Sequence, residues 1–180
     1  AITLDNYRIR LMANIESINE IKTLKSFGAE GVGLYRTEFL YLSSQSFPSE
    51  RDLYENFKKA AQEIAPQPII IRTLDIGMDK QPAFLKKNDE DNPALGLRGI
   101  RMSLANPELF SIQLRAILRA SFYGDVKIMY PMISDVQEVI QANSILDKVK
   151  EEMKEKQIPY NDDIEIGAMI ETPAAVICSD

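Results

Sequence analysis

The chain has 180 residues, of which 45% are apolar and 27% charged, and its net charge is −6. These values fit one globular domain with a substantial core, so we expect a single domain over residues 1–180. The acidic balance argues against nucleic acid or an anionic membrane as the main partner. No apolar run approaches the roughly 18 residues that a membrane span requires.

Cysteine and histidine usage narrows the chemistry further. A single cysteine, Cys178, cannot form an internal disulfide, and we therefore expect a reducing compartment, by default the cytoplasm. The chain has no histidine, which removes the commonest acid–base group at neutral pH and excludes a phosphohistidine relay within these residues.

Short apolar runs alternate with longer amphipathic stretches along the chain, a pattern that predicts βαβ units. Each run is short enough for a buried parallel strand. The predicted strands cover residues 9–13, 31–35, 68–71, 126–130 and 164–170.

The first two predicted helices follow the first two strands. Ser17 and Glu20 fit a capping box, in which each side chain binds a free backbone amide, and Gly28 is placed to end that helix in the left-handed conformation. Residues 49–65 carry apolar side chains at helical spacing, so the second helix should bury one stripe against the sheet.

Two later helices have clear start signals. Asn106 and Pro107 are typical of a cap followed by the first helical residue. Ser134 and Gln137 fit a second capping box, and the apolar residues that follow them form one stripe.

Five strands with a helix after each fit either an open doubly wound sheet or a (β/α) barrel, and periodicity does not separate the two. Thr172 and Pro173 would begin a further helix, yet the chain ends at Asp180, so we expect it to be cut within that helix. A complete barrel takes about 250 residues. On the barrel interpretation, roughly three βα units are therefore absent.

Charged residues stand at the ends of three predicted strands, where parallel α/β folds place their functional groups. They are Arg36, Arg72 and Glu171. Two arginines suit a phosphate or carboxylate, because each guanidinium offers paired donors. A carboxylate beside them suggests Mg²⁺, which often takes one or two protein carboxylates and completes its shell with ligand oxygens. A phosphorylated carboxylic acid would match all three.

Plainer interpretations stay open for each feature. The three charges could begin solvated loops or pair with one another. Gly31 and Gly33 begin a spacing typical of nucleotide-binding loops, but Arg36 replaces its third glycine, so we reject a nucleotide site. Cys178 has no histidine to activate it and is more simply a small helix residue than a nucleophile.

Longer motifs in fixed order resemble a known family. The segments are GAEGVGLYRTEFL (28–40), RTLDIG (72–77) followed by Asp79 and Lys80, NPALGLR (92–98), QLRAILRA (113–120) and EIGAMIETPAA (165–175). Together they resemble the C-terminal domain of the phosphoenolpyruvate-protein phosphotransferases, enzyme I of the bacterial sugar phosphotransferase system. The resemblance spans nearly the whole chain.

The resemblance implies an α/β fold that is a partial (β/α)₈ TIM barrel, containing about the first five βα units. It implies Mg²⁺-dependent transfer of a phosphoryl group from phosphoenolpyruvate to an enzyme histidine, and from there to the carrier protein HPr in the pathway of sugar transport. By position in the motifs, Arg36 and Arg72 would bind the phosphoryl group and Glu171 would be one of two carboxylate ligands of magnesium. Lys80 and Arg98 lie in matching motifs and are weaker candidates for the same site.

The chain also departs from the family pattern. Met78 stands where the family has a second glycine, which could alter ligand affinity. The second metal carboxylate, a further arginine and the catalytic cysteine segment would lie after residue 180, so Cys178 is not that cysteine. The phosphohistidine domain that meets HPr would precede residue 1. We therefore assign no catalytic residue in this chain and expect it to be inactive alone.

Two alternatives remain from the sequence. The chain could be the barrel of a pyruvate phosphate dikinase or phosphoenolpyruvate synthase, which share the chemistry, or a non-catalytic half-barrel that serves as an interaction or regulatory module. Because an incomplete barrel exposes strand edges, we also expect a homodimer or other self-association.

Overall fold

The computed structural model describes residues 2–42, 46–76 and 96–179. Its sheet has five parallel strands in the order β1-β2-β3-β4-β5. The strands are β1 (Ala13–Ile15), β2 (Val32–Tyr35), β3 (Ile69–Arg72), β4 (Val126–Tyr130) and β5 (Ile166–Ala168). Each strand therefore pairs with its neighbour in sequence, and the chain crosses the sheet in one direction.

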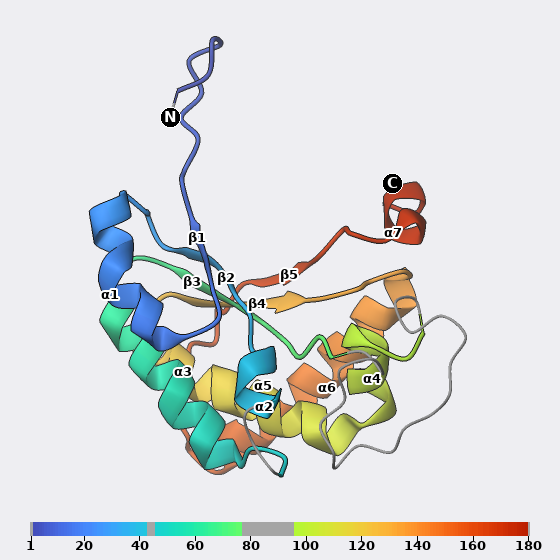
Figure 1. The fold of residues 1–180 in the computed structure, drawn as a ribbon. Coiled ribbons are helices and arrows are strands. Elements are labelled where there is room, and N and C mark those ends of the chain that lie inside the picture. Colours follow the sequence, from blue (N-terminus) through green and yellow to red (C-terminus); the bar gives the residue numbers. More distant parts are fainter. Residues whose placement is uncertain (1, 43–45, 77–95, 180) are drawn as a thin grey trace.

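Helices connect the strands and gather on one side of the sheet, where Figure 1 shows α1, α3, α5 and α6. The helical elements are η1 (Ile18–Glu20), α1 (Ile21–Leu24), η2 (Lys25–Phe27), α2 (Glu38–Leu42), α3 (Glu50–Ile64), α4 (Gly99–Ala105), α5 (Pro107–Ser121), α6 (Val136–Glu155) and α7 (Pro173–Ile177). A doubly wound sheet reverses its strand order and carries helices on both faces. The α/β class is thus confirmed, and the sequential order is consistent with part of a barrel, while barrel closure stays a prediction.

The core lies between the sheet and these helices. Alternate side chains of the central strands are fully buried there, namely Ile69, Ile71, Val126, Ile128 and Tyr130. The residues between them are only half-buried, because successive side chains of a strand point to opposite faces. Arg72 belongs to this second set, so its side chain lies on the face of the sheet that the helices leave uncovered.

Ion pairs connect α3, α5 and α6 on the outer side of the helical layer. Arg115 on α5 pairs with Glu50 on α3 at 3.2 Å and with Glu152 on α6 at 2.6 Å. Arg119, one turn further along α5, also pairs with Glu50, at 2.8 Å. These arginines account for most of the polar residues in the 113–120 motif, and they lie on helices rather than at strand ends.

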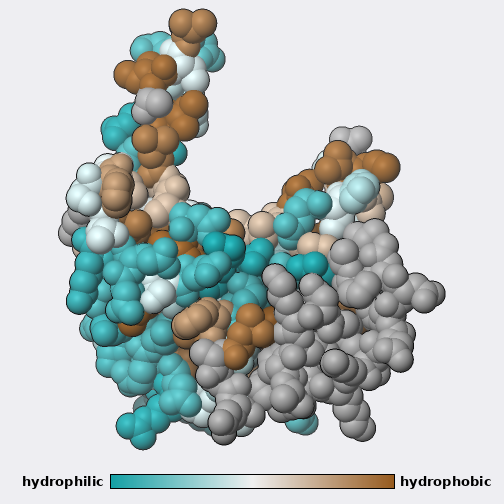
Figure 2. Space-filling model, in the orientation of Figure 1, coloured by the Kyte–Doolittle hydropathy of each residue, from teal (hydrophilic) through white to brown (hydrophobic). Residues whose placement is uncertain are grey.

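The predicted first strand is displaced in the structure. Residues 2–11 form an arm that projects from the body, with an isolated antiparallel bridge between Ile2 and Arg8 (Figure 1). Pairing with β2 begins only at Ala13, so the predicted strand at residues 9–13 was wrong in all but its last residue. Ile9 and Leu11 are 44% and 54% exposed, because they lie before the chain reaches the sheet. Figure 2 shows apolar side chains on this arm and on the projecting α7 segment.

The structure confirms most of the predicted helix caps and corrects one. Ser17 and Glu20 form the predicted capping box, although the turn they begin is a 3₁₀ turn before α1, and Gly28 has the predicted positive φ of 73°. The box at Ser134 and Gln137 was wrong by one residue. Asp135 is the N-cap of α6 and its partner is Glu138, because the chain turns into the helix one residue later than the pattern suggested.

The start of α5 and α7 also matches the sequence. Asn106 occupies the cap position before Pro107, but its side chain donates to the Met102 carbonyl at 2.9 Å instead of capping the helix. Thr172 caps α7 with a hydrogen bond from the Ala175 amide. Within the described part of the chain, no helix is both long enough and apolar enough to cross a membrane.

Candidate functional site

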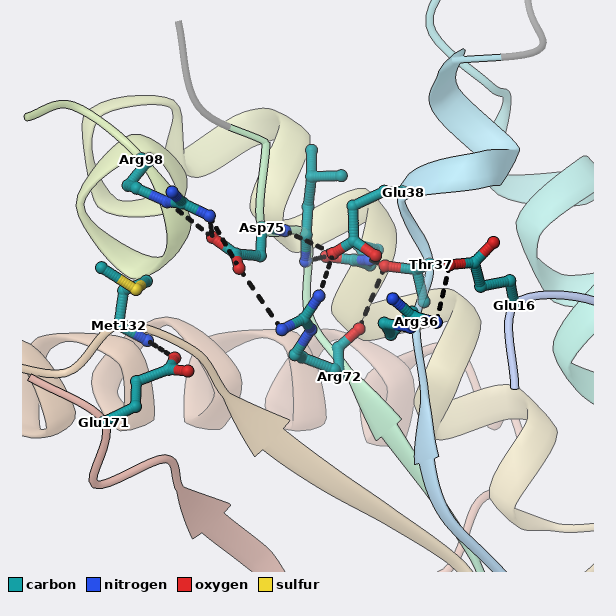
Figure 3. A network of polar contacts seen from close by, with 11 residues as sticks. Glu16, Arg36, Thr37, Glu38, Arg72, Asp75, Arg98, Met132 and Glu171 are labelled. Carbon is teal, nitrogen blue, oxygen red and sulfur yellow. Dashed lines mark hydrogen bonds and ion pairs between the residues drawn. The ribbon is translucent and has the colours of Figure 1, made fainter. Parts of the chain in front are cut away.

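The three charged residues at predicted strand ends all lie at the carboxyl edge of the sheet. Arg36 follows β2 directly, Arg72 is the last residue of β3, and Glu171 comes three residues after β5. Figure 3 shows their side chains along this edge, with Arg36 and Arg72 on neighbouring strands and Glu171 further away. The local pattern of strand followed by charge therefore placed each residue correctly.

Arg72 is held between two carboxylates. One terminal guanidinium nitrogen lies 3.0 Å from Glu38 and the other lies 3.3 Å from Asp75. The Arg72 side chain is only 11% exposed, and its Nε is buried without a hydrogen-bond partner among the described residues. Charge-assisted bonds from two directions fix the plane of this guanidinium.

Asp75 joins Arg72 to a second arginine, Arg98. Its two oxygens accept from Arg98 Nε and Nη2 at 3.1 and 3.2 Å, a bidentate arrangement. The Asp75 amide donates to Glu38 at 3.1 Å, which closes the group into one network (Figure 3). Among the described residues the network holds two arginines and two acids, so the formal charges of this part balance.

Burial raises the pKa of the Glu38 carboxyl above its ordinary value. The positive charge of Arg72 opposes this rise, while the nearby Asp75 carboxylate adds to it. Loss of water outweighs the ion pair, because the side chain of Glu38 is only 17% exposed.

The raised pKa of Glu38 predicts a pH dependence of stability. The folded chain binds the Glu38 proton more tightly than the unfolded chain, so the free energy of unfolding falls as pH rises from the ordinary glutamate pKa of about 4.3 through the raised one. Glu38→Gln removes this contribution. In urea unfolding at a series of pH values, the stability of the original chain relative to Glu38→Gln should decrease as pH rises. Glu155→Gln, at the exposed end of α6, is the control. If the stability of the original chain relative to Glu38→Gln increases as pH rises, the prediction is contradicted.

Arg36 has a more open environment than Arg72. Its guanidinium pairs with Glu16 at 2.7 Å, and the side chain is 40% exposed. Its backbone amide donates to Ile15 at the end of β1, which fixes where the side chain starts. Both arginines thus pair with carboxylates that are not among the three strand-end charges, Arg36 with Glu16 and Arg72 with Glu38 and Asp75.

Glu171 is exposed and anchored at one oxygen. Its Oε1 accepts the Met132 amide at 2.8 Å, in the loop that follows β4. The next residue, Thr172, donates to the Ile133 carbonyl at 2.8 Å and so ties the same two loops together. In residues 2–42, 46–76 and 96–179, no three His, Cys, Asp or Glu side chains are close enough to hold a metal. One anchored carboxylate fits a site where other groups complete the Mg²⁺ shell.

Some sequence predictions fall outside the described residues, namely those for Met78, Asp79, Lys80 and residues 92–95. Arg98, the other weaker candidate, lies in the network through Asp75. Cys178 is an exposed free cysteine that caps the end of α7.

Sequence reasoning assigned no role to Glu38 or Asp75. Both were visible as carboxylates within the motifs that carry the arginines, two residues after Arg36 and three after Arg72. The structure shows that each binds Arg72. A charge of opposite sign at such short spacing was the available signal.

Comparison with known proteins identifies the family of the chain. The family described as "PEP-utilising enzyme, PEP-binding domain" matches residues 1–180. Among relatives named phosphoenolpyruvate-protein phosphotransferase, that of Listeria monocytogenes is 45% identical over 179 residues, covering 99% of this chain and 31% of its own length. That of Buchnera aphidicola is 44% identical over 177 residues, covering 98% of this chain and 31% of its own length. The chain thus spans about a third of the length of these relatives, and it belongs to the PEP-utilising enzymes as their PEP-binding domain.

Proposed function

We propose that this chain forms the phosphoenolpyruvate-binding edge of a phosphotransferase. The observation that carries the proposal is that Arg36 and Arg72 lie at the carboxyl ends of neighbouring parallel strands, with Arg72 oriented by Glu38 and Asp75 and joined through Asp75 to Arg98. Buried, oriented guanidiniums are the groups that recognise phosphate and carboxylate oxygens in proteins.

Arg36 and Arg72 bind the phosphoryl group in this proposal. Arg72 supplies an oriented guanidinium with an unused Nε, and Arg36 supplies a more exposed one that exchanges Glu16 for the ligand. The charge balance of the network around Arg72 makes ligand binding a competition with the acids that hold it. Phosphoryl transfer depends mainly on such positioning and on stabilising charge on the transferred oxygens.

Glu171 is the protein ligand of Mg²⁺ in the same proposal. Its Oε1 is fixed by the Met132 amide, and the exposed side chain leaves the other oxygen facing the solvent edge. The metal would stabilise negative charge on the phosphoryl oxygens. A single carboxylate suffices on this chain, because phosphate oxygens and further protein groups complete such shells.

The proposed role of Glu171 predicts that Mg²⁺ strengthens phosphoenolpyruvate binding and that Glu171→Gln abolishes this effect. Calorimetric titration of phosphoenolpyruvate with and without Mg²⁺ measures it, and we expect a difference of about tenfold in Kd for the original chain. Glu165→Gln is the matched control, because Glu165 precedes the opposite end of β5 and pairs with Lys127. Equal Mg²⁺ dependence in both variants would contradict the assignment of Glu171.

The same titration distinguishes a phosphoenolpyruvate enzyme from a non-catalytic half-barrel. A folded chain that binds no phosphoenolpyruvate under any of these conditions would favour the non-catalytic half-barrel. Saturable binding supports a phosphoenolpyruvate enzyme. The names of the relatives favour the phosphotransferase over pyruvate phosphate dikinase or phosphoenolpyruvate synthase.

The activity of the whole protein completes the proposal. The phosphoryl group passes to an enzyme histidine and then to HPr, in the cytoplasm and in the service of sugar transport. The histidine belongs to another part of the protein, because this chain has none. The outer edges of β1 and β5 have no neighbouring strand within the described sheet, and self-association through such edges also belongs to the proposal.

A further inference from the structure

Gln113 is a buried amide that the anion site does not use directly. It lies on α5, is 2% exposed, and stands first in the 113–120 motif whose arginines fasten the outer helices. Burying an amide is costly unless its hydrogen bonds are satisfied. The partners of Gln113 therefore indicate what its side chain does.

Both ends of the Gln113 amide bind the loops that carry the arginines. Its Oε1 accepts the Leu74 amide at 3.0 Å, in the loop after β3. Its Nε2 donates to the Thr37 hydroxyl at 3.3 Å, in the loop after β2. One side chain thus joins the segments that follow Arg36 and Arg72.

Thr37 extends this connection to Arg72 itself. Its side chain is fully buried, and its hydroxyl donates to the Arg72 carbonyl at 3.0 Å. Three hydrogen bonds therefore run from α5 to Thr37, from Thr37 to the backbone of Arg72, and from Leu74 back to α5. Figure 3 shows the bond from the Thr37 hydroxyl to the Arg72 carbonyl.

These hydrogen bonds fix the separation between the ends of β2 and β3. Beyond the backbone ladder, side chains join the loops after β2 and β3, Glu38 through Arg72 and the Asp75 amide, and Gln113 through Thr37 and Leu74. The register of this strand pair is irregular between Val32 and Tyr35. A buried amide with two defined partners admits one geometry, whereas an apolar side chain would pack at many. The two guanidiniums can meet one phosphoryl group only if their starting points are held.

We propose that Gln113 is a positioning residue for the phosphoenolpyruvate site, which sets the spacing of Arg36 and Arg72 through Thr37 and Leu74. The inference rests on the proposed function. In this inference Gln113 acts through the two loops that it binds and not through contact with the ligand.

Gln113→Leu and Thr37→Val test the inference, because each removes hydrogen bonds at nearly constant volume. We expect each to raise the Kd of phosphoenolpyruvate about tenfold in the presence of Mg²⁺, which corresponds to about 1.4 kcal/mol. In the double variant the increase should stay far below the product of the single effects, because both substitutions break the same connection.

Ser121→Ala is the matched control at the other end of α5. Ser121 is 4% exposed, and its hydroxyl joins the Leu118 carbonyl to the amide of Asn161, which lies before the start of β5 and not after a strand end. We expect it to lower thermal stability as the Gln113 and Thr37 variants do, while leaving the Kd unchanged. Similar losses of affinity in all three variants, or unchanged affinity in Gln113→Leu and Thr37→Val, would overturn the positioning role alone. A folded original chain that binds no phosphoenolpyruvate would overturn the proposed function and, with it, this inference.

Discussion

Replacing Arg72 with alanine should weaken phosphoenolpyruvate binding by at least about a hundredfold, the loss expected for two charge-assisted hydrogen bonds of about 1.5 kcal/mol each. The same change should lower stability, because Glu38 and Asp75 would keep their buried positions without this cation. Calorimetric titration with Mg²⁺ measures the first effect and urea unfolding the second. Arg72→Lys should recover part of the stability and little of the affinity, because an ammonium cannot reproduce the planar fork.

Arg115→Ala is the control that separates the two effects of Arg72→Ala. Arg115 is 18% exposed and also pairs with two carboxylates, Glu50 and Glu152, but it lies on the outer side of the helical layer. It should lose stability to a similar degree and bind phosphoenolpyruvate as the original chain does. If Arg72→Ala binds as tightly as Arg115→Ala, Arg72 has only the structural role that its two ion pairs already provide.

The sequence predicted the central strands well, because their short apolar runs are bounded by polar and turn residues and their side chains alternate between buried and half-buried. The run at residues 126–130 coincides with β4. It failed at β1, where Ile9 and Leu11 continue the apolar pattern outside the sheet and remain exposed. Strand pairing is a long-range property, so a local pattern cannot tell which part of an apolar run joins the sheet.

The candidate site was predictable to the level of its strand ends. Arg36, Arg72 and Glu171 lie at the carboxyl edge as predicted, because charges that follow apolar runs are expected there, although Arg72 is the last residue of its strand and Glu171 comes three residues after β5. The network that orients Arg72 was not predicted, since Asp75 and Arg98 are 23 residues apart and meet only through the fold. The contact of Gln113 was even less predictable from local sequence, because its partner Thr37 is 76 residues away.

The sequential order of the strands also required the structure. Apolar runs alternating with helices are compatible with a doubly wound sheet and with a barrel, and only pairing order and helix placement distinguish them. With the helices on one side, the half-buried face carries Arg72 and, at the other end of the strands, the Lys127 pair with Glu165. A closed barrel would enclose these polar groups in its interior, whereas an open sheet would leave them at its surface.

Phe57→Ala is expected to be the most destabilising single change in the core, costing about 3–5 kcal/mol of unfolding free energy. Phe57 lies on α3, is fully buried, and packs edge-to-face on Tyr35 with ring centroids 6.2 Å apart. Tyr35 is the last residue of β2, and its hydroxyl donates to Asn56 on the same helix at 2.6 Å. The cavity would therefore remove the support beneath the strand that presents Arg36.

Urea unfolding at neutral pH measures this loss, and two further variants define it. Phe57→Leu keeps most of the volume and should cost less than about 1.5 kcal/mol if packing volume is what matters. Phe27→Ala removes the same atoms from a side chain that is 82% exposed and should change stability by less than about 0.5 kcal/mol. If Phe57→Ala resembles Phe27→Ala, the layer between α3 and β2 contributes little to the fold. If the loss of stability instead decreases from Phe57→Ala to Phe57→Leu to Phe27→Ala, packing against α3 supports β2, the strand that precedes Arg36.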